Sequence, residues 1–149
     1  MLHINTKCQQ PATPDDSVTL IFELRSKSRQ RVRLDSGQEA AISLVRGSQL
    51  FPGDLLISDC GKVVEVKAGN EKLSIVQSDD QLLLARASYH LGNRHIALQI
   101  NHNELRYLHD HVLDEMVEGL GLAVQVELLP FMPESGAYGE HAHVPGHSH

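Results

Sequence analysis

Histidine is the residue type that most clearly offers chemistry in this sequence. There are 10 histidines among 149 residues, and four of them lie in the last stretch: His141, His143, His147 and His149. Neutral imidazole binds Zn²⁺, Cu²⁺ and Ni²⁺, and a flexible segment can bring several rings to one ion. A cloning tag is the plain alternative, but Val, Pro, Gly and Ser interrupt the run. We therefore expect this segment to bind a metal ion.

A second candidate metal site is the pair His109 and His111, which Asp110 separates. In a strand, residues i and i+2 share a face with their Cα atoms ~6.6–7 Å apart. In a helix the same two residues point about 200° apart and cannot share an ion. We expect His109 at a strand end and His111 in a first helical turn, so their junction decides whether the rings converge. The alternative is two solvated histidines beside an N-capping aspartate.

Three further histidines stand alone in the pattern: His90, His95 and His102. His95 follows Asn93 and Arg94 at the start of an expected strand. A single histidine at such a place is more often structural or solvated than a ligand. One chain offers few rigid ligands, but a two-fold dimer would double every residue near its axis.

A basic ladder forms the third feature, since every second residue is basic in one segment. Its members are Arg25, Lys27, Arg29, Arg31 and Arg33. On an extended strand these side chains would form one stripe. The stripe could dock an acidic protein, or it could be a solvated edge that discourages aggregation. A nucleic-acid groove is the weaker third option, because no aromatic residues interleave.

Other chemistries lack their motifs. The sequence contains no GxGxxG, Walker A, HExxH or GxSxG pattern, and these carry nucleotide binding, zinc proteolysis and serine hydrolysis. A zinc enzyme around His109 and His111 is conceivable, but no pattern supplies a third ligand or a general base. We expect no catalytic residue and no enzyme activity.

The charge is unevenly distributed along the chain. Residues 1–72 carry 10 basic and 9 acidic residues, whereas residues 73–149 carry 3 basic and 10 acidic residues and nine of the ten histidines. An acidic surface rich in histidine attracts cations and repels phosphate backbones. We therefore expect a metal ion as the ligand and no nucleic-acid partner.

The first part of the chain is predicted to be all-β. Short apolar runs alternate with turn residues that contain Gly, Pro, Asp and Asn. The expected strands are Val18–Leu24, Arg31–Leu34, Ala40–Val45, Asp54–Ser58 and Lys62–Ala68. No amphipathic helix is visible before residue 78.

The second part alternates strands with helices. Asp79 and Asp80 offer acidic residues to the N-terminus of a first helix, and Asp110 can cap a second helix. Glycines follow both helical patterns. Strands are expected at Leu73–Gln77, Ile96–Ile100, Leu105–Leu108 and Ala123–Leu129. This order is β-α-β-β-α-β, which is the order of an α+β, ferredoxin-like fold.

These patterns divide the chain into a β domain (1–72), a ferredoxin-like domain (73–133) and a disordered His-rich tail (134–149). The two cysteines, Cys8 and Cys60, have no CxxC spacing, which fits a reducing compartment. No secretory h-region and no apolar run of ~18–20 residues is visible. We expect a cytoplasmic protein that does not bind a membrane.

Two motifs resemble a known family. They are Tyr89-His90-Leu91-Gly92-Asn93-Arg94-His95 and Leu105-Arg106-Tyr107-Leu108-His109-Asp110-His111-Val112-Leu113, and the chain then ends in histidines. Together they resemble the UreE family of urease accessory proteins, which are nickel metallochaperones. The N-terminal part matches more loosely, through Gly53-Asp54-Leu55 and Val64-Glu65-Val66-Lys67-Ala68.

The resemblance implies an N-terminal peptide-binding domain, a C-terminal metal-binding domain and a homodimer formed through the latter. It implies that His95 lies at the dimer interface, where both copies bind one metal, and that His109 and His111 form a peripheral site. It further implies delivery of Ni²⁺ to the urease apoprotein together with other accessory proteins, including a GTPase. Zn²⁺ or Cu²⁺ could occupy the same histidines, and a nickel or zinc buffer without delivery is the alternative function.

Overall fold

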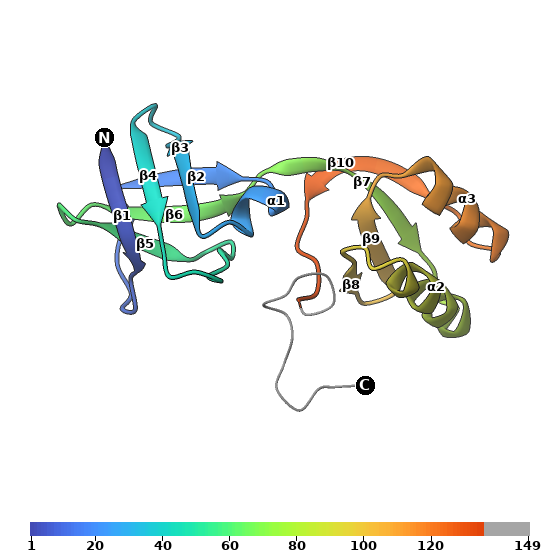
Figure 1. Ribbon diagram of the computed structural model, residues 1–149. Helices are drawn as coiled ribbons and strands as arrows, with labels where there is room; N and C mark the ends of the chain where they lie inside the picture. The colour runs from blue at the N-terminus through green and yellow to red at the C-terminus, as the bar shows by residue number, and fades with distance from the viewer. Residues whose placement is uncertain (136–149) are drawn as a thin grey trace. The chain divides into compact units, whose positions relative to one another are not determined.

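The computed structural model describes residues 1–135, and the chain divides into two compact units. The first unit comprises Met1–Gly69 and the second begins at Asn70, a few residues before the boundary expected from the sequence. Both units are mostly β, with helices (Figure 1). Among the described residues, no helix is both long enough and apolar enough to cross a membrane.

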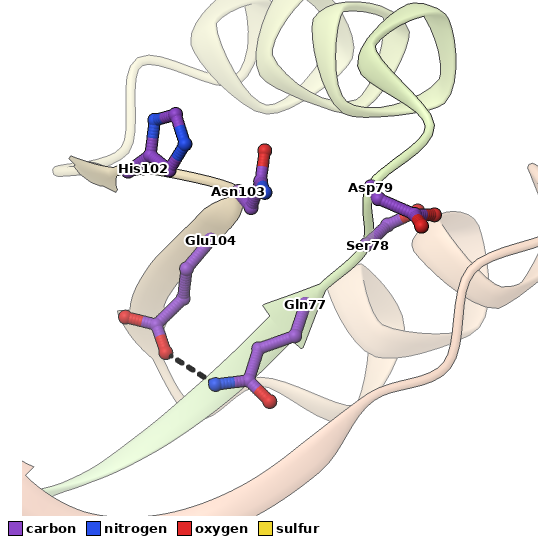
Figure 2. Close-up of a pocket in the computed structure, with 6 residues that line it drawn as sticks. All are labelled: Gln77, Ser78, Asp79, His102, Asn103 and Glu104. Atoms are coloured by element: carbon purple, nitrogen blue, oxygen red, sulfur yellow. Dashed lines mark hydrogen bonds between the residues drawn. The ribbon is translucent and has the colours of Figure 1, made fainter.

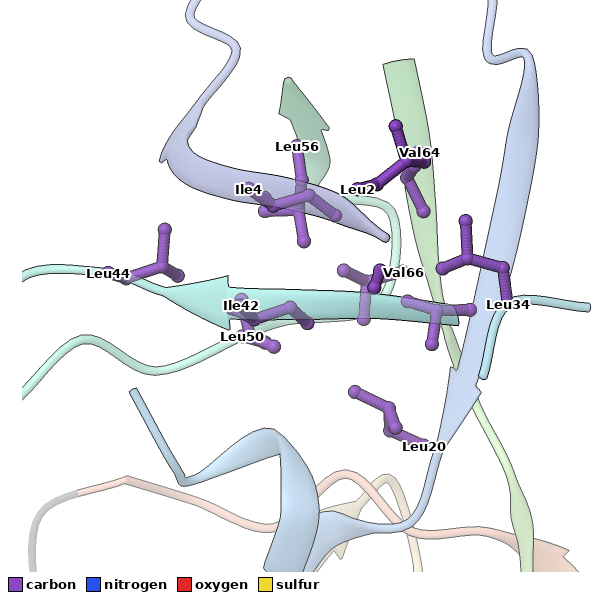
Figure 3. Packing of buried hydrophobic residues seen from close by; sticks show 12 residues of the cluster. Leu2, Ile4, Leu20, Leu34, Ile42, Leu44, Leu50, Leu56, Val64 and Val66 are labelled. Carbon is purple, nitrogen blue, oxygen red and sulfur yellow. The ribbon is translucent and has the colours of Figure 1, made fainter. Parts of the chain in front are cut away.

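The first unit is built on one six-stranded sheet with the order β2-β6-β5-β1-β4-β3. Its elements are β1 (Leu2–Lys7), β2 (Asp16–Leu20), α1 (Phe22–Arg25), β3 (Arg29–Arg33), β4 (Glu39–Ser43), β5 (Leu55–Ser58) and β6 (Val63–Ala68). The sheet is mixed, because β1 pairs with β4 and β2 pairs with β6 in parallel. Alternating residues of the strands point into an aliphatic core that includes Ile4, Ile42 and Val66 (Figure 3).

The start of this unit differs from the sequence prediction in two ways. No strand was expected at the N-terminus, yet β1 lies in the middle of the sheet between β5 and β4. The strand expected over Val18–Leu24 ends at Leu20 and is followed by the helix α1. In α1 both Phe22 and Arg25 are buried. In a continuing strand these two side chains would point to opposite faces of the sheet.

The second unit has a four-stranded antiparallel sheet with the order β10-β7-β9-β8. Its elements are β7 (Asn70–Gln77), α2 (Gln81–Asn93), β8 (Gln99–Asn101), β9 (Glu104–Leu108), α3 (His111–Gly119) and β10 (Gln125–Pro130). Both helices contribute to a core with Val76, Leu105 and Tyr107, so they cover one face of the sheet. The segment after β10 stays attached to the unit as far as Glu134, whose amide donates to Leu98 O at 2.8 Å.

The bounds of one expected strand differ from those observed, and the expected tail is described only in part. The strand expected over Ile96–Ile100 is observed at Gln99–Asn101. It begins later because the chain first turns after α2 at His95, which has a left-handed backbone conformation. The expected tail begins with residues that are still hydrogen-bonded to the unit. Its remainder, residues 136–149, lies outside the described residues.

Candidate metal centre

Asp110 organises the junction between β9 and α3. Its carboxylate accepts hydrogen bonds from the amides of Val112 at 2.9 Å and Leu113 at 3.1 Å. These amides have no partner within the helix, so Asp110 is an N-cap. As expected from the sequence, His109 follows the strand directly and His111 is the first residue of the helix.

His109 turns toward the interior of the unit. Its Nδ1 lies 3.1 Å from Asp114 Oδ2 and 3.2 Å from Ser74 Oγ. Asp114 comes from the first turns of α3 and is only 8% exposed, while Ser74 comes from β7 and is fully buried. The imidazole retains 28% of its exposure. One edge of the ring is therefore fixed by buried groups, and the rest reaches the surface.

Asp114 is the centre of a buried hydrogen-bond network. Its Oδ1 accepts from Ser74 Oγ and from Tyr107 Oη, both at 2.6 Å. Burial raises the pKa of Tyr107, and the hydrogen bond to Asp114 raises it further. With His109 as a third partner, the carboxylate is satisfied on both oxygens, which makes its burial tolerable.

His111 turns toward solvent instead. Its Nε2 lies 3.0 Å from Glu115 Oε1, one helical turn away, and the two side chains are 82% and 65% exposed. An exposed pair of this kind holds its geometry only weakly. The two rings thus contact different carboxylates of α3, one buried and one exposed, and they do not converge in the described structure.

Ser74, His109 and Asp114 do not form a hydrolytic triad. In such a triad the serine contacts the ring nitrogen opposite the carboxylate. Here Ser74 and Asp114 contact the same nitrogen, Nδ1, and Ser74 also donates to Asp114. The arrangement orients a histidine and provides no activated nucleophile.

His95 occupies the turn after α2. Its φ is 56°, a left-handed conformation that is uncommon for any residue other than glycine. Its amide donates to Gly92 O at 3.0 Å, which closes the helix end. The residue is exposed. The carbonyl end of a helix carries a partial negative charge, which favours a cation nearby.

His102 lines an open hollow of about 460 Å³ with Gln77, Asp79 and Glu104. Figure 2 shows the Glu104 carboxylate turned toward Gln77 and away from the His102 ring. Burial alone would raise the pKa of Glu104, but hydrogen bonds from Asn101, Gln77 and Arg106 outweigh it and lower that pKa. The carboxylate is already satisfied, so the hollow does not form a cation site. His90 is exposed, with its ring edge-on to Tyr89.

Within residues 1–135, no three His, Cys, Asp or Glu side chains gather in a way that could hold a metal ion. His95, His109 and His111 therefore do not form one site within a single chain. The tail candidates His141, His143, His147 and His149 lie outside the described residues.

The basic ladder is not continuous. Arg25 is in α1 and only 2% exposed, with its Nε donating to Leu20 O at 3.1 Å. The expectation of a single five-residue stripe was therefore wrong, because the segment bends inward at α1. Lys27 lies in the connection to β3 and is exposed. Arg29, Arg31 and Arg33 do form an exposed stripe on β3, which is an edge strand.

Comparison with known proteins decides the family. The family model described as "UreE urease accessory protein, N-terminal domain" matches residues 2–69, and the corresponding C-terminal domain model matches residues 71–149. The chain belongs to the UreE family of urease accessory proteins. The boundary between the two matches coincides with the boundary between the two compact units.

Several proteins named urease accessory protein UreE are similar over nearly the whole chain. The protein of Citrobacter koseri is 47% identical, and the alignment covers 100% of each chain. That of Alkalilimnicola ehrlichii is 52% identical over 93% of this chain and 85% of its own length. That of Proteus mirabilis is 52% identical over 85% of this chain and 78% of its own length.

All of the candidate histidines fall within the match to the UreE C-terminal domain. Ser74 and Asp114, which hold His109, and Tyr107, which holds Asp114, were not predicted from the sequence. One signal was available for Asp114, because it shares a helix face with Leu113 and Val117, where a charge needs a partner. Ser74 and Tyr107 could be found only from the pairing of β7 with β9.

Proposed function

We propose that this protein is a nickel metallochaperone that serves urease maturation. In this proposal it binds Ni²⁺ through histidines at a homodimer interface and delivers the ion to the urease apoprotein. Membership of the UreE family supports the role in urease maturation. In this proposal nickel is cargo and not a catalytic cofactor, and the protein acts as an accessory chaperone without enzyme activity of its own.

The exposed position of His95 is the observation that best supports the nickel proposal. It is exposed at the carbonyl end of α2, and no hydrogen bond of its ring is found among the described residues. A single imidazole is too little for a tight site, but a two-fold axis near His95 would supply a second one. Such a shared site is open enough to release its ion when a partner approaches.

His109 and His111 form the proposed peripheral part of the binding surface. The tail residues His141, His143, His147 and His149 add capacity in this proposal, and Zn²⁺ or Cu²⁺ could bind at the same rings. Imidazole binds a metal only in its neutral form, so nickel affinity should fall as the pH drops below ~6.5.

The fold of the second unit supports the ferredoxin-like assignment. Its element order is β-α-β-β-α-β, and its strand order places the first and third strands in the centre. We assign metal binding and dimerisation to this unit, and peptide or partner binding to the first unit. Both cysteines are free thiols, which supports a cytoplasmic location.

The partner surface proposed on the first unit is the edge strand β3. Arg29, Arg31 and Arg33 offer an exposed positive stripe there, and Lys27 lies close by in sequence. Such a stripe suits an acidic face of the urease apoprotein or of another accessory protein such as the GTPase. Reversing the charge of Arg29 and Arg31 should weaken that complex, and an unchanged complex would refute this assignment.

Calorimetric titration with Ni²⁺ tests the proposal, with light scattering to give the mass. The four tail histidines are replaced by alanine in the full-length chain, and His95→Ala is added in a matched variant. We expect one tight ion for two chains in the first protein and its loss in the second. Tight binding that disappears with the tail histidines alone would refute the interface site and favour a nickel or zinc buffer.

A further inference from the structure

The Nδ1 atom of His109 faces two oxygen atoms. One belongs to the Asp114 carboxylate at 3.1 Å, and the other belongs to the Ser74 hydroxyl at 3.2 Å. An ionised carboxylate only accepts hydrogen bonds, whereas a hydroxyl can donate one and accept others. The protonation of Nδ1 therefore depends on where the single hydroxyl hydrogen of Ser74 goes.

That hydrogen is already used. Ser74 Oγ donates to Asp114 Oδ1 at 2.6 Å, a distance much shorter than its distance to the imidazole. Ser74 can then only accept from His109, as Asp114 does. Both neighbours of Nδ1 are acceptors, so Nδ1 must carry a hydrogen. In the neutral ring this leaves the lone pair on Nε2.

We propose that Asp114 is a positioning residue that holds His109 in the Nδ1–H tautomer, so that His109 binds a cation only through Nε2. Tyr107 and Ser74 support this role, because they keep Asp114 Oδ1 occupied and Oδ2 directed at the ring. The metal part of this inference rests on the proposed nickel function. The tautomer part does not.

Burial makes the arrangement strong enough to fix a tautomer. Ser74 and Tyr107 are fully buried and Asp114 is nearly so, which leaves little room for water to compete. Hydrogen bonds to ionised groups are also stronger than those between neutral groups. An orienting carboxylate of this kind typically changes metal affinity by ~10–100-fold.

His111 provides a contrast on the other side of Asp110. Its carboxylate neighbour Glu115 contacts Nε2 instead of Nδ1, and both side chains are largely exposed. Water competes freely for that contact, so it fixes no tautomer. Glu115→Gln is therefore a matched control for Asp114→Asn, since both changes replace a carboxylate beside a histidine with an amide.

The test reads the ¹⁵N shifts of the His109 ring by NMR in the metal-free, full-length protein at about pH 8, above the usual histidine pKa of ~6.5. We expect a protonated Nδ1 and an unprotonated Nε2. In Asp114→Asn, Ser74 and Tyr107 should retain the amide oxygen, so the NH₂ group faces Nδ1 and the tautomer inverts. Glu115→Gln should leave the ring unchanged.

Nickel is then added to the same samples, and the broadening of the His109 resonances gives the affinity at this residue. We expect Asp114→Asn to weaken it ~10–100-fold and Glu115→Gln to leave it unchanged. Thermal melting checks that each variant folds. If Asp114→Asn does not fold, the spectrum of the unmodified protein still decides the tautomer.

Three results would overturn the inference: an Nε2–H tautomer in the unmodified protein, an Asp114→Asn variant with unchanged tautomer and affinity, or an equal effect of Glu115→Gln. A different result concerns the proposed function. If the tautomer is as expected but nickel leaves the His109 resonances untouched, nickel binding at this residue is refuted while its orientation by Asp114 stands.

Discussion

His95 lies just after α2 and His109 lies just before α3, so each histidine occupies one end of a helix. They are held in different ways. The backbone of His95 is in a left-handed conformation, and its ring has no hydrogen-bond partner among the described residues. The backbone of His109 continues directly from β9, and its ring is fixed by Asp114 and Ser74.

The difference separates two properties that the proposed nickel carrier would need. A ring without side-chain support can reorient, which suits an ion that is shared between two chains and later released. A ring with a buried carboxylate behind it presents one nitrogen in one direction, which favours capture. We therefore expect substitutions at His109 to destabilise the fold, and substitutions at His95 to change it little or, with glycine, to stabilise it.

The largest expected effect is on stability at His109. His109→Ala removes one of the donors to Asp114 and should destabilise the protein by about 1–3 kcal/mol, because the carboxylate remains buried. Urea unfolding measures the change. His95→Ala is the control, and it should change stability by less than His109→Ala does, because the ring is exposed and alanine keeps the same left-handed backbone conformation. Equal losses at both positions would break the comparison.

A second prediction concerns alkaline pH. The raised pKa of Tyr107 means that the unfolded chain loses this proton first, near pH ~10. The associated stability is present below that pH and is lost above it, by up to about 1.4 kcal/mol per pH unit. Tyr107→Phe should flatten the alkaline limb of stability against pH. The exposed Tyr89 supplies the control variant, Tyr89→Phe, which should keep the slope of the unmodified protein.

The third prediction separates the cap from the charge at Asp110. Asp110→Ala should cost about 1 kcal/mol, because the amides of Val112 and Leu113 lose their acceptor. Asp110→Asn keeps a good cap and should cost little. Urea unfolding compares the three proteins. If Asn is as costly as Ala, the charge near the two histidines matters more than the cap.

The smallest effect is expected at His95, and its sign is the informative part. His95→Gly should stabilise the protein by roughly 0.5–1 kcal/mol, because glycine adopts a φ of 56° without strain. The same variant should lose tight nickel binding. Urea unfolding and nickel titration of one sample test both statements. A destabilised His95→Gly protein would show that the ring makes contacts that support the fold.

Local signals explain what the sequence could predict. Asp110 was predicted as a helix cap, and Asp79 and Asp80 as the acidic start of the other helix, where Asp80 is the N-cap. A helix start depends only on a residue and its next few neighbours. The position of His109 and His111 on either side of a strand–helix junction followed from the same cap. The alternation of apolar residues placed most strands within a few residues of their observed bounds.

Contacts distant in sequence explain what could not be predicted. Arg25 has the basic spacing of its neighbours, and its burial arises from the tertiary structure around α1. The partners of His109 come from β7 and α3, and these two partners, Ser74 and Asp114, are 40 residues apart in sequence. No local pattern could join Ser74 to Asp114 before the strand pairing was known.

The place of β1 in the first sheet has a consequence for synthesis on the ribosome. This strand precedes the other described strands along the chain, yet it pairs with Ala40–Ile42 of β4 and with Leu56–Ser58 of β5. Pairings this distant along the chain form slowly, because the entropy of closing a long loop is lost before the contacts contribute any stabilising free energy. Leu2 therefore has no strand partner until β4 has been translated, and Ile4 gains its second partner only after β5 has been translated. The N-terminal unit completes its fold only when nearly all of its own sequence has left the ribosome.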